Sequence, residues 1–362
     1  MTTMKEISQI AGVSISTVSL VLNNRDSGRI KPRIAAKIRK IAKERGYTPN
    51  LMARGLRTSQ THILGFLSEE VATTPYAGLM ILGAQDAASQ YGYVIMTVST
   101  DGISNEEAEI SALQRYGVDG FFIAKMSNRH ATVPESLKNY HTILVNASDA
   151  ALYADTPTDN HAPSGRTGIA PDEVSIGYDA TKRLIDAGCH KIAYIGCEEP
   201  MLAEGLRLEG YKKALAEAGR EFNPALAIQV HRNDEALQKV RTLMNDEHPD
   251  GFFCFNDARA WYVYDTAARM GLTIGEDIHV VGVDNHRVLA ETLSPQLSTI
   301  ELPHYEMGYW AACKLISLIE HKNPDSFTLP ETTAALPPLS CDGNVSIHCS
   351  LIEKNSVKKA QQ

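Results

Sequence analysis

The sequence contains no long apolar run and little sign of export. No stretch of its 362 residues approaches the roughly 18 consecutive apolar residues that a membrane helix requires, so we expect no membrane association. The first residues, Met-Thr-Thr-Met-Lys-Glu, lack the apolar core of a signal peptide, which predicts a cytoplasmic protein.

Cysteine is scarce and is not arranged for metal binding. The six cysteines form no Cys-x-x-Cys pair, and His190 and His348 adjoin a cysteine without a metal-ligand spacing. We therefore predict free thiols in a reducing compartment, no metal and no cofactor. Cys341 and Cys349 would form a disulfide only in an oxidising compartment.

The common enzyme motifs are also missing. The sequence has no Gly-x-Gly-x-x-Gly, phosphate loop, Gly-x-Ser-x-Gly or His-Glu-x-x-His. Asp257 and Asp284 are the best candidate carboxylates, and neither has an evident histidine partner. We expect that the chain is not an enzyme, and turnover of a bound sugar would contradict this expectation.

Charge is present but unevenly distributed. Residues 1–60 carry five Lys and seven Arg against three acidic residues, a net charge of +9. The whole chain carries −8, so the remainder carries −17. This contrast favours a polyanion as the partner of the N-terminal segment, the alternative being a solvated basic helix face.

The N-terminal segment has the pattern of a helix-turn-helix. Thr3-x-x-Glu6 is typical of a capping box that opens a helix over Met4 to Ala11, and Gly12 ends that helix. Ser14 is a suitable N-cap for a second helix, from Ile15 to about Leu22. A third helix is predicted from Pro32 to Gly46. The inward-facing residues of the first helix are expected to be Ile7, Ile10 and Ala11.

From Thr61 onward, short apolar strands alternate with amphipathic helices. Strands are predicted at 63–67, 94–98, 120–124, 142–145, 192–195, 226–230, 252–255 and 278–283, and helices at 78–90, 106–116, 178–187, 204–218, 235–244 and 258–270. Such alternation predicts parallel sheets covered by helices on both faces. Two similar sets indicate two α/β halves with a ligand crevice at the carboxyl ends of the strands.

Several motifs resemble one family. They are ISQIAGVSISTVSLVLN at 7–23, GYTPN at 46–50 and ARGLRT at 53–58, followed by GCHKIAYIG at 188–196, Asn256-Asp257 and GVDN at 282–285. Together they resemble the family of the lactose, galactose and purine repressors. The resemblance implies an all-α helix-turn-helix head joined to a periplasmic-binding-protein-like body of two doubly wound parallel-sheet halves. It also implies a homodimeric repressor that binds a roughly palindromic double-stranded DNA operator under the control of a small effector.

The resemblance also supplies boundaries. We expect a DNA-binding domain at 1–48, a hinge helix at 49–60, a body at 61–355 and a tail at 356–362. Within the body, the N-terminal half would comprise about 61–170 and 301–330, and the C-terminal half about 171–300 and 331–355. The chain would thus cross between the halves near residues 170, 300 and 330.

The resemblance assigns DNA-binding residues to the second helix and the hinge. They are Ser14, Ile15, Ser16, Thr17, Ser19, Leu20 and Asn23 on the helix, and Asn50, Ala53, Arg54, Leu56 and Arg57 in the hinge. Leu20 stands where the family often has Arg, so it would contact a thymine methyl group or no base at all. Core packing is the alternative for Ile15 and Leu20. Leu56 matches the leucine that wedges open a central base step, or else it packs on the body.

Ligand-binding candidates follow the strands of the body. They are Tyr76, Asn146, Arg207, Asn256, Trp261 and Asp284, a set suited to the hydroxyls of a sugar or nucleoside. Helix or loop capping is the alternative for Asn256 and Asp284, and a structural ion pair is the alternative for Arg207. Trp261 either stacks on a sugar face or packs at an interface. Arg259 stands where the family usually has a small or aliphatic residue.

Two further alternatives remain open at this point. A transport solute-binding protein would have the same body but not the basic head, and a protein co-regulator would replace the small effector while keeping the DNA function.

The segment Asp155 to Pro171, rich in Thr, Pro, Asn, Ser and Gly, is predicted to be a mobile loop.

Overall fold

The chain folds into two units, which are described separately below. The computed structural model describes residues 2–23, 25–47, 60–100, 106–149, 167–231 and 233–358. One unit is the N-terminal head, up to His62, and the other is the body, from Ile63 onward. Among the described residues, no helix is both long enough and apolar enough to span a membrane.

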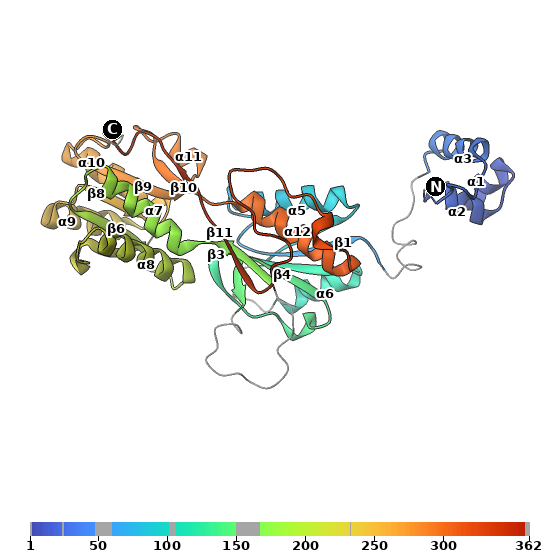
Figure 1. Ribbon diagram of the computed structural model, residues 1–362, viewed down its shortest axis with the longest axis horizontal. Helices are drawn as coiled ribbons and strands as arrows, with labels where there is room; N and C mark the ends of the chain where they lie inside the picture. The colour runs from blue at the N-terminus through green and yellow to red at the C-terminus, as the bar shows by residue number, and fades with distance from the viewer. Residues whose placement is uncertain are drawn as a thin grey trace. The chain divides into compact units, whose positions relative to one another are not determined.

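The described residues of the head form three short helices (Figure 1): α1 (Met4–Ala11), α2 (Ile15–Leu22) and α3 (Pro32–Glu44). Both halves of the predicted capping box form, because Thr3 accepts from the backbone N–H of Glu6 and the Glu6 side chain accepts from Thr3 N–H. Gly12 ends α1 with φ 70°, a left-handed conformation that glycine adopts without strain.

The head has a small core formed by all three helices. Its buried residues are Ile7, Ala11, Val18, Val21, Ala35, Ile38, Ile41 and Ala42. Ile10 was expected in this core but is 45% exposed, so that prediction was wrong. The apolar face of α1 that meets its neighbours consists of Ile7 and Ala11 with the partly buried Met4.

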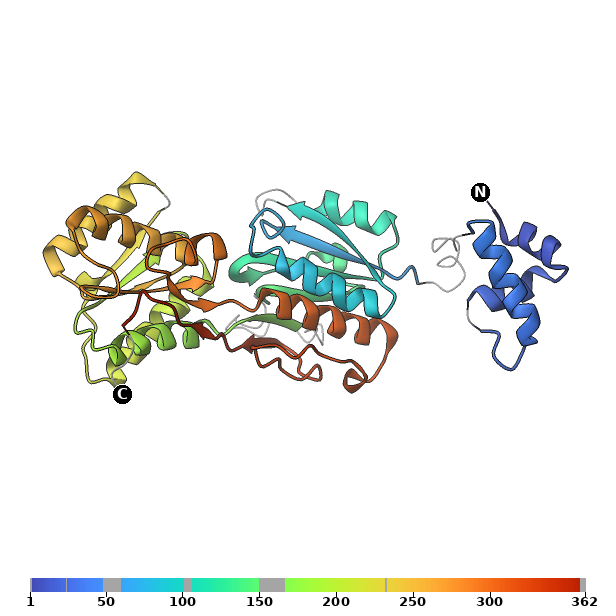
Figure 2. The same ribbon diagram turned by 90° about the horizontal axis from the view of Figure 1, so that it is seen from above.

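The first lobe of the body is a parallel sheet with helices on both faces (Figure 2). Its strands are β1 (Ile63–Glu69), β2 (Val94–Thr100), β3 (Gly120–Ala131), β4 (His141–Asp149), β5 (Thr167–Pro171) and β11 (Asn344–Ile347), in the spatial order β11-β5-β4-β3-β1-β2. Its helices are α5 (Leu79–Gln90), α6 (Glu107–Arg115) and α12 (His304–Glu320).

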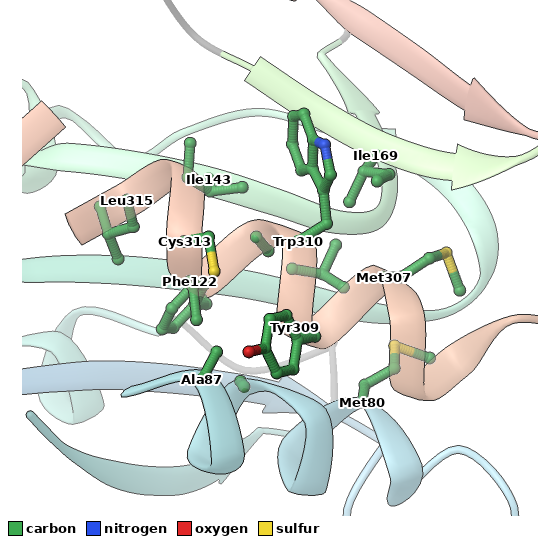
Figure 3. Packing of buried hydrophobic residues seen from close by; sticks show 14 of the residues in the cluster. Met80, Ala87, Phe122, Ile143, Ile169, Met307, Tyr309, Trp310, Cys313 and Leu315 are labelled. Atoms are coloured by element: carbon green, nitrogen blue, oxygen red, sulfur yellow. The ribbon is translucent and has the colours of Figure 1, made fainter. Parts of the chain in front are cut away.

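Helices α5 and α12 cover the same face of this sheet (Figure 3), where Trp310 of α12 lies beside Ile169 of β5. The two helices approach closely through glycines. A Cβ added to Gly83 would lie 2.0 Å from the carbonyl oxygen of Tyr305, and one added to Gly308 would lie 1.9 Å from that of Met80. This spacing buries α12 so fully that it presents no amphipathic stripe.

The second lobe repeats the architecture. Its strands are β6 (Ile192–Cys197), β7 (Ala227–Val230), β8 (Gly251–Cys254), β9 (His279–Asp284), β10 (Ser298–Glu301) and β12 (Leu351–Ile352), in the order β12-β10-β9-β8-β6-β7. Helices α7 (Glu173–Asp186) and α8 (Leu202–Glu217) pack on one face, and α9 (Asp234–Glu247) and α10 (Asp257–Met270) pack on the other. A single turn, α11 (Arg287–Ala290), follows β9. The strand pairs of this sheet are parallel except β10 with β12, which is antiparallel. The predicted fold class of two doubly wound, mostly parallel sheets is confirmed.

The chain crosses between the lobes three times, but one crossing differs from the prediction. Crossings follow β5 and β10, as expected. The third lies between β11 and β12, near residue 349, and not near 330. Residues 331–347 therefore belong to the first lobe, where Ala334, Leu339 and Ile347 join its core.

Two other expectations for the body were wrong. Thr167–Pro171 is not loop but strand β5, buried between β4 and β11 in the sheet. The rest of the predicted loop, residues 155–166, lies outside the described residues. Helix α7 begins at Glu173, five residues before the predicted start, because Asp172 caps it by accepting from the N–H of Ser175.

Candidate DNA interface and ligand cleft

The second helix of the head presents both polar and apolar side chains to solvent. Ser14 caps it by accepting from Thr17 N–H at 3.1 Å, and the Ser14 hydroxyl also contacts those of Ser16 and Thr17 at 2.7 and 2.9 Å. Ile15 is 48% exposed, so the alternative that it packs in the core is wrong. An exposed isoleucine at the start of this helix is available for an apolar contact with a base.

Ser16 is exposed like Ile15, and the predicted residues of this helix from Thr17 onward are half-buried. Leu20 lies outside the core cluster of the described head residues. Asn23 ends the helix and donates its side-chain amide to the carbonyl of Ser19 at 2.7 Å. Thr17 and Ser19 keep partial exposure, which is consistent with phosphate contacts.

Basic side chains follow this helix in the loop and on α3, and several of them have structural partners. Arg39 pairs with Asp26 at 2.7 Å, and Lys37 donates to the carbonyl of Ala11 at 3.0 Å, at the end of α1. These contacts join α3 to the loop after α2 and to α1. Further exposed basic residues on the loop and on α3 are Arg25, Arg29, Lys31 and Arg33.

The predicted hinge lies outside the described residues. This applies to Asn50, Ala53, Arg54, Leu56 and Arg57, so their assignment to DNA stays a prediction from the sequence.

In the body, five of the six predicted ligand residues line one cavity between the lobes. Tyr76 and Asn146 come from the first lobe, and Arg207, Asn256 and Asp284 come from the second. The cavity has a volume of only about 10 Å³, roughly the space of one water molecule. The side chains of the cleft therefore fill it themselves, and a ligand requires the lobes to separate or the side chains to rearrange.

Trp261 is the exception among the predicted ligand residues. It lies on α10, is 42% exposed and contacts the ring of Tyr262 edge-on at 5.6 Å. It does not line the cavity. Of the two interpretations, packing at an interface is therefore the one that its position favours.

Sequence reasoning missed Glu173, which lines the cavity beside Arg207. Its Oε2 accepts from Arg207 Nε at 2.6 Å, and both side chains are almost wholly buried. The structural ion pair foreseen as the alternative for Arg207 is thus present. The sequence Pro171-Asp172-Glu173 could have located Glu173, because Asp172 is a good N-cap for a helix that begins at Glu173. The predicted helix began at residue 178, which left Glu173 outside it.

Two arginines enclose Phe255 at the end of β8. The guanidinium carbon of Arg207 lies 4.4 Å from the ring centroid, and that of Arg259 lies 5.2 Å from it. Arg207 also donates to the carbonyl of Phe255 at 2.5 Å. These contacts hold the phenyl ring in the wall of the cavity.

Arg259, the residue that departs from the family pattern, is a buried structural centre. It donates to the carbonyl of Gly196 at 3.1 Å and to Asn256 Oδ1 at 3.2 Å, and it contacts the sulfur of Cys197 at 2.8 Å. Asn256 Oδ1 also accepts from Arg259 N–H, so Asn256 caps α10 as foreseen. Arg259 therefore fixes the ends of β6 and β8 behind the cavity.

Asp284 has an unusual environment for a carboxylate. Burial raises its pKa to about 7, although the nearby charge of Arg207 and a hydrogen bond from Tyr76 act in the opposite direction. Burial also raises the pKa of Glu173, again against the charge of Arg207. Two buried carboxyl groups thus share a single guanidinium at the centre of the cavity.

Aromatic rings from both lobes pack around Tyr76 at the cavity. Tyr76 packs edge-on against His286 at 4.9 Å and lies 5.7 Å from His304. His304 is buried, burial and the charge of Arg207 lower its pKa to about 3, and its Nε2 has no hydrogen-bond partner among the described residues. A neutral imidazole beside the cavity can donate or accept one hydrogen bond.

The backbone around the cavity is strained at three of its residues. Ser127, Asn146 and Asp284 adopt φ values of 60°, 53° and 114°, in the region that favours glycine. Non-glycine residues in this region concentrate at ligand-binding sites. Acceptor oxygens, an amide and one guanidinium at close range form a site suited to hydroxyl groups.

Comparisons with known proteins agree with both units. Residues 3–50 match the family "Bacterial regulatory proteins, lacI family", and residues 181–335 match the "Periplasmic binding protein-like domain". The chain is 31% identical to the ribose operon repressor of Haemophilus influenzae over 333 residues, which cover 91% of this chain and 95% of that protein.

Two further comparisons agree with this result, the first for the sequence and the second for the fold alone. The chain is 29% identical to the sucrose operon repressor of Shigella flexneri, covering 87% of this chain and 94% of that protein. The fold resembles the lac repressor dimer bound to operator and the anti-inducer ONPF, with a TM-score of 0.75, 19% identity and 99% of each chain covered. The chain therefore belongs to the lacI family of bacterial regulatory proteins and is a DNA-binding transcription regulator, not an enzyme.

Proposed function

We propose that this chain is a cytoplasmic repressor whose affinity for operator DNA is set by a small, neutral, hydroxyl-rich effector bound between the lobes of the body. The observation that carries the proposal is the convergence of five candidate residues from both lobes on one cavity. A ligand that contacts both lobes changes the equilibrium between their arrangements.

Each residue has a role in this proposal. Arg207 donates to ligand hydroxyls, Asp284 accepts from them, and Asn146 and Asn256 contribute amides. Tyr76 and Phe255 provide apolar surface for the faces of a sugar ring. The lining holds two carboxyl groups and a single guanidinium, so it offers no net positive charge to a phosphorylated ligand, which disfavours such ligands.

Relatives give the chemical class some support. Two of them are named as repressors of the ribose and sucrose operons. Ribose and sucrose differ in size, but both carry many hydroxyl groups. We therefore assign the effector to the sugars and leave the particular sugar to experiment.

The proposed unit of action is a homodimer on a roughly palindromic operator. Ile15 and its neighbours on α2 contact bases and phosphates in the major groove, and Leu56 of the hinge enters the minor groove. Effector binding changes the separation of the paired hinges and hence DNA affinity. Leu56→Ala should therefore weaken specific binding more than non-specific binding, and equal losses would contradict this role.

Exposed apolar side chains on the body supply candidate dimer contacts. On the first lobe they are Leu79 and Leu82 of α5 and Val94 of the edge strand β2, and on the second lobe they are Trp261 and Val288. Leu82→Glu should convert a dimer to a monomer in sedimentation analysis. An unchanged dimer would place the interface elsewhere.

The central experiment is a titration of operator affinity. Fluorescence anisotropy with a labelled operator fragment, repeated with individual sugars, should show a change of at least tenfold in Kd for one of them. Asp284→Asn should abolish that change and leave sugar-free operator binding intact. If no sugar changes the affinity, but a protein from the host does, the regulator responds to a protein partner instead.

A further inference from the structure

A second cavity lies beside the first, and it also has walls from both lobes. Its volume is about 180 Å³, room for several water molecules, whereas the inner cavity holds about one. It is lined by Asn128, Ser148, Asp172, Leu202, Leu206 and Ser346, among others. We call it the outer compartment and the cavity around Asp284 the inner compartment.

Glu173 forms the partition between the two compartments, since it lines both. On the inner side it pairs with Arg207 at 2.6 Å. On the outer side it accepts a hydrogen bond from the side chain of Asn128. Glu173 is thus the side chain that the two compartments share, and a rotation of it would widen the path between them.

The outer compartment contains an unsatisfied acceptor. Asn128 is 3% exposed, and its Oδ1 has no hydrogen-bond partner among the described residues. A buried carbonyl without a donor costs about 1–3 kcal/mol. A hydroxyl or amine of a ligand in this compartment would satisfy it.

The rest of the lining defines the chemistry that fits. Asp172 and Glu173 are carboxylic residues, Ser148 and Ser346 are hydroxyls, and no Lys, Arg or His is among the lining residues. Leu202 and Leu206, which lie one turn apart on α8, offer an apolar surface to this compartment. Sugars carry both hydroxyl donors and an apolar ring face, whereas an anion would meet two carboxyl groups and no cationic side chain of the lining.

We infer that the effector consists of two linked rings, as in a disaccharide or a glycoside, with one ring in each compartment. This inference rests on the proposed function and adds the size of the ligand. The inner ring contacts Asp284 and Arg207, the second ring contacts Asn128 and the leucines of α8, and Glu173 receives a hydroxyl from either ring near the linkage.

The test uses the full-length protein in isothermal titration calorimetry. The probes are sucrose, cellobiose and maltose, together with their components glucose and fructose. One disaccharide should bind at least tenfold more tightly than either of its components.

A variant that fills the outer compartment separates the two sites. Leu206→Trp should remove the advantage of the disaccharide and leave the Kd of the component sugar within twofold. Ser346→Tyr, at an exposed position of β11, provides a second way to fill the compartment if the first variant folds poorly. Glu209→Trp, at an exposed position of α8 outside the lining, is the matched control and should leave all affinities unchanged.

Two outcomes would overturn the inference, and they are distinguishable. If the disaccharide and its components bind equally and neither filling variant changes their affinities, the ligand occupies the inner compartment alone and a sugar effector still stands. If none of the five sugars binds while operator binding is intact, both the two-ring ligand and the sugar effector are wrong.

Discussion

Arg207 and Glu173 form a buried ion pair, with 2.6 Å between Nε and Oε2, in the wall between the two lobes. The pair joins the first residue of α7 to a residue inside α8. Arg207 also donates to the carbonyl of Phe255, the residue directly after β8, so the pair is anchored to the carboxyl end of that strand.

Removing one partner of this pair should be costly. Arg207→Ala leaves a buried carboxyl group without its cation, and we expect a loss of about 3–5 kcal/mol in the free energy of unfolding. Urea denaturation measures the loss. The double variant Arg207→Met/Glu173→Leu is the control and should recover much of it, because no charge is then left buried. A loss below about 1 kcal/mol in the single variant would show that the pair contributes little.

The raised pKa of Asp284 predicts opposite pH dependences for stability and binding. An unfolded aspartate has a pKa of about 3.9, so between pH 4 and 7 the folded protein holds more protons at Asp284. The free energy of unfolding should therefore fall as the pH rises through this range. Burial raises the pKa of Asp257 as well, which adds to the same trend.

Sugar affinity should increase between pH 6 and 8, because ionised Asp284 is the better acceptor. Calorimetric titrations at several pH values, with Asp284→Asn as the comparison, measure this effect. The variant should show a weaker pH dependence of stability over pH 4–7. A wild-type affinity that is constant over pH 6–8 would argue against direct contact between Asp284 and the ligand.

Gly210 sets the approach of α8 to α7. A Cβ at this position would lie 2.0 Å from the carbonyl oxygen of Val174, so Gly210→Ala should force the helices apart and cost about 1–3 kcal/mol. It should also weaken sugar binding, because these helices carry Arg207 and Glu173. Gly205→Ala on the same helix meets open space and should stabilise the fold by up to about 1 kcal/mol. Thermal denaturation compares the two variants, and similar midpoints would contradict the close-packing explanation.

Ile15 should act in DNA binding and not in folding. Because its side chain is about half exposed, Ile15→Ala should leave the thermal midpoint of the head nearly unchanged. Loss of an apolar base contact should reduce specific operator affinity by about 1–2 kcal/mol, roughly 5- to 30-fold. Binding to unrelated DNA should change little. Gln9→Ala, at an exposed position of α1, provides the control. If both variants change operator affinity equally, Ile15 does not contact a base.

The sequence allowed the head and the alternation of the body to be predicted, because local signals determine them. The Thr3–Glu6 capping box, Gly12 and the Ser14 cap act within one turn of helix, and all three are present in the structure. Strands such as β8 and β9 are short apolar runs followed by polar residues. Asp284 and Asn256 could be predicted as cavity residues because they are polar residues at the carboxyl ends of such apolar runs.

Elements whose residues are buried on every side were not predictable in this way. Helix α12 is buried along most of its length and so shows no apolar stripe with a helical period. Strand β5 has the sequence Thr-Gly-Ile-Ala-Pro, whose Gly and Pro predict a loop when only the local sequence is considered. It forms a strand because it pairs with β4 and β11. The role of Glu173 depends on Arg207, 34 residues away, and spacing along the chain does not reveal such a pair.

The last crossing between the lobes has a consequence for biosynthesis. Strands β11 and β12 each complete one sheet, and both come from residues 344–352. A nascent chain that ends before residue 344 therefore leaves an unpaired sheet edge on each lobe, and exposed edges are templates for aggregation. A frameshift or stop codon shortly before residue 344 should therefore damage both halves of the body and not only one.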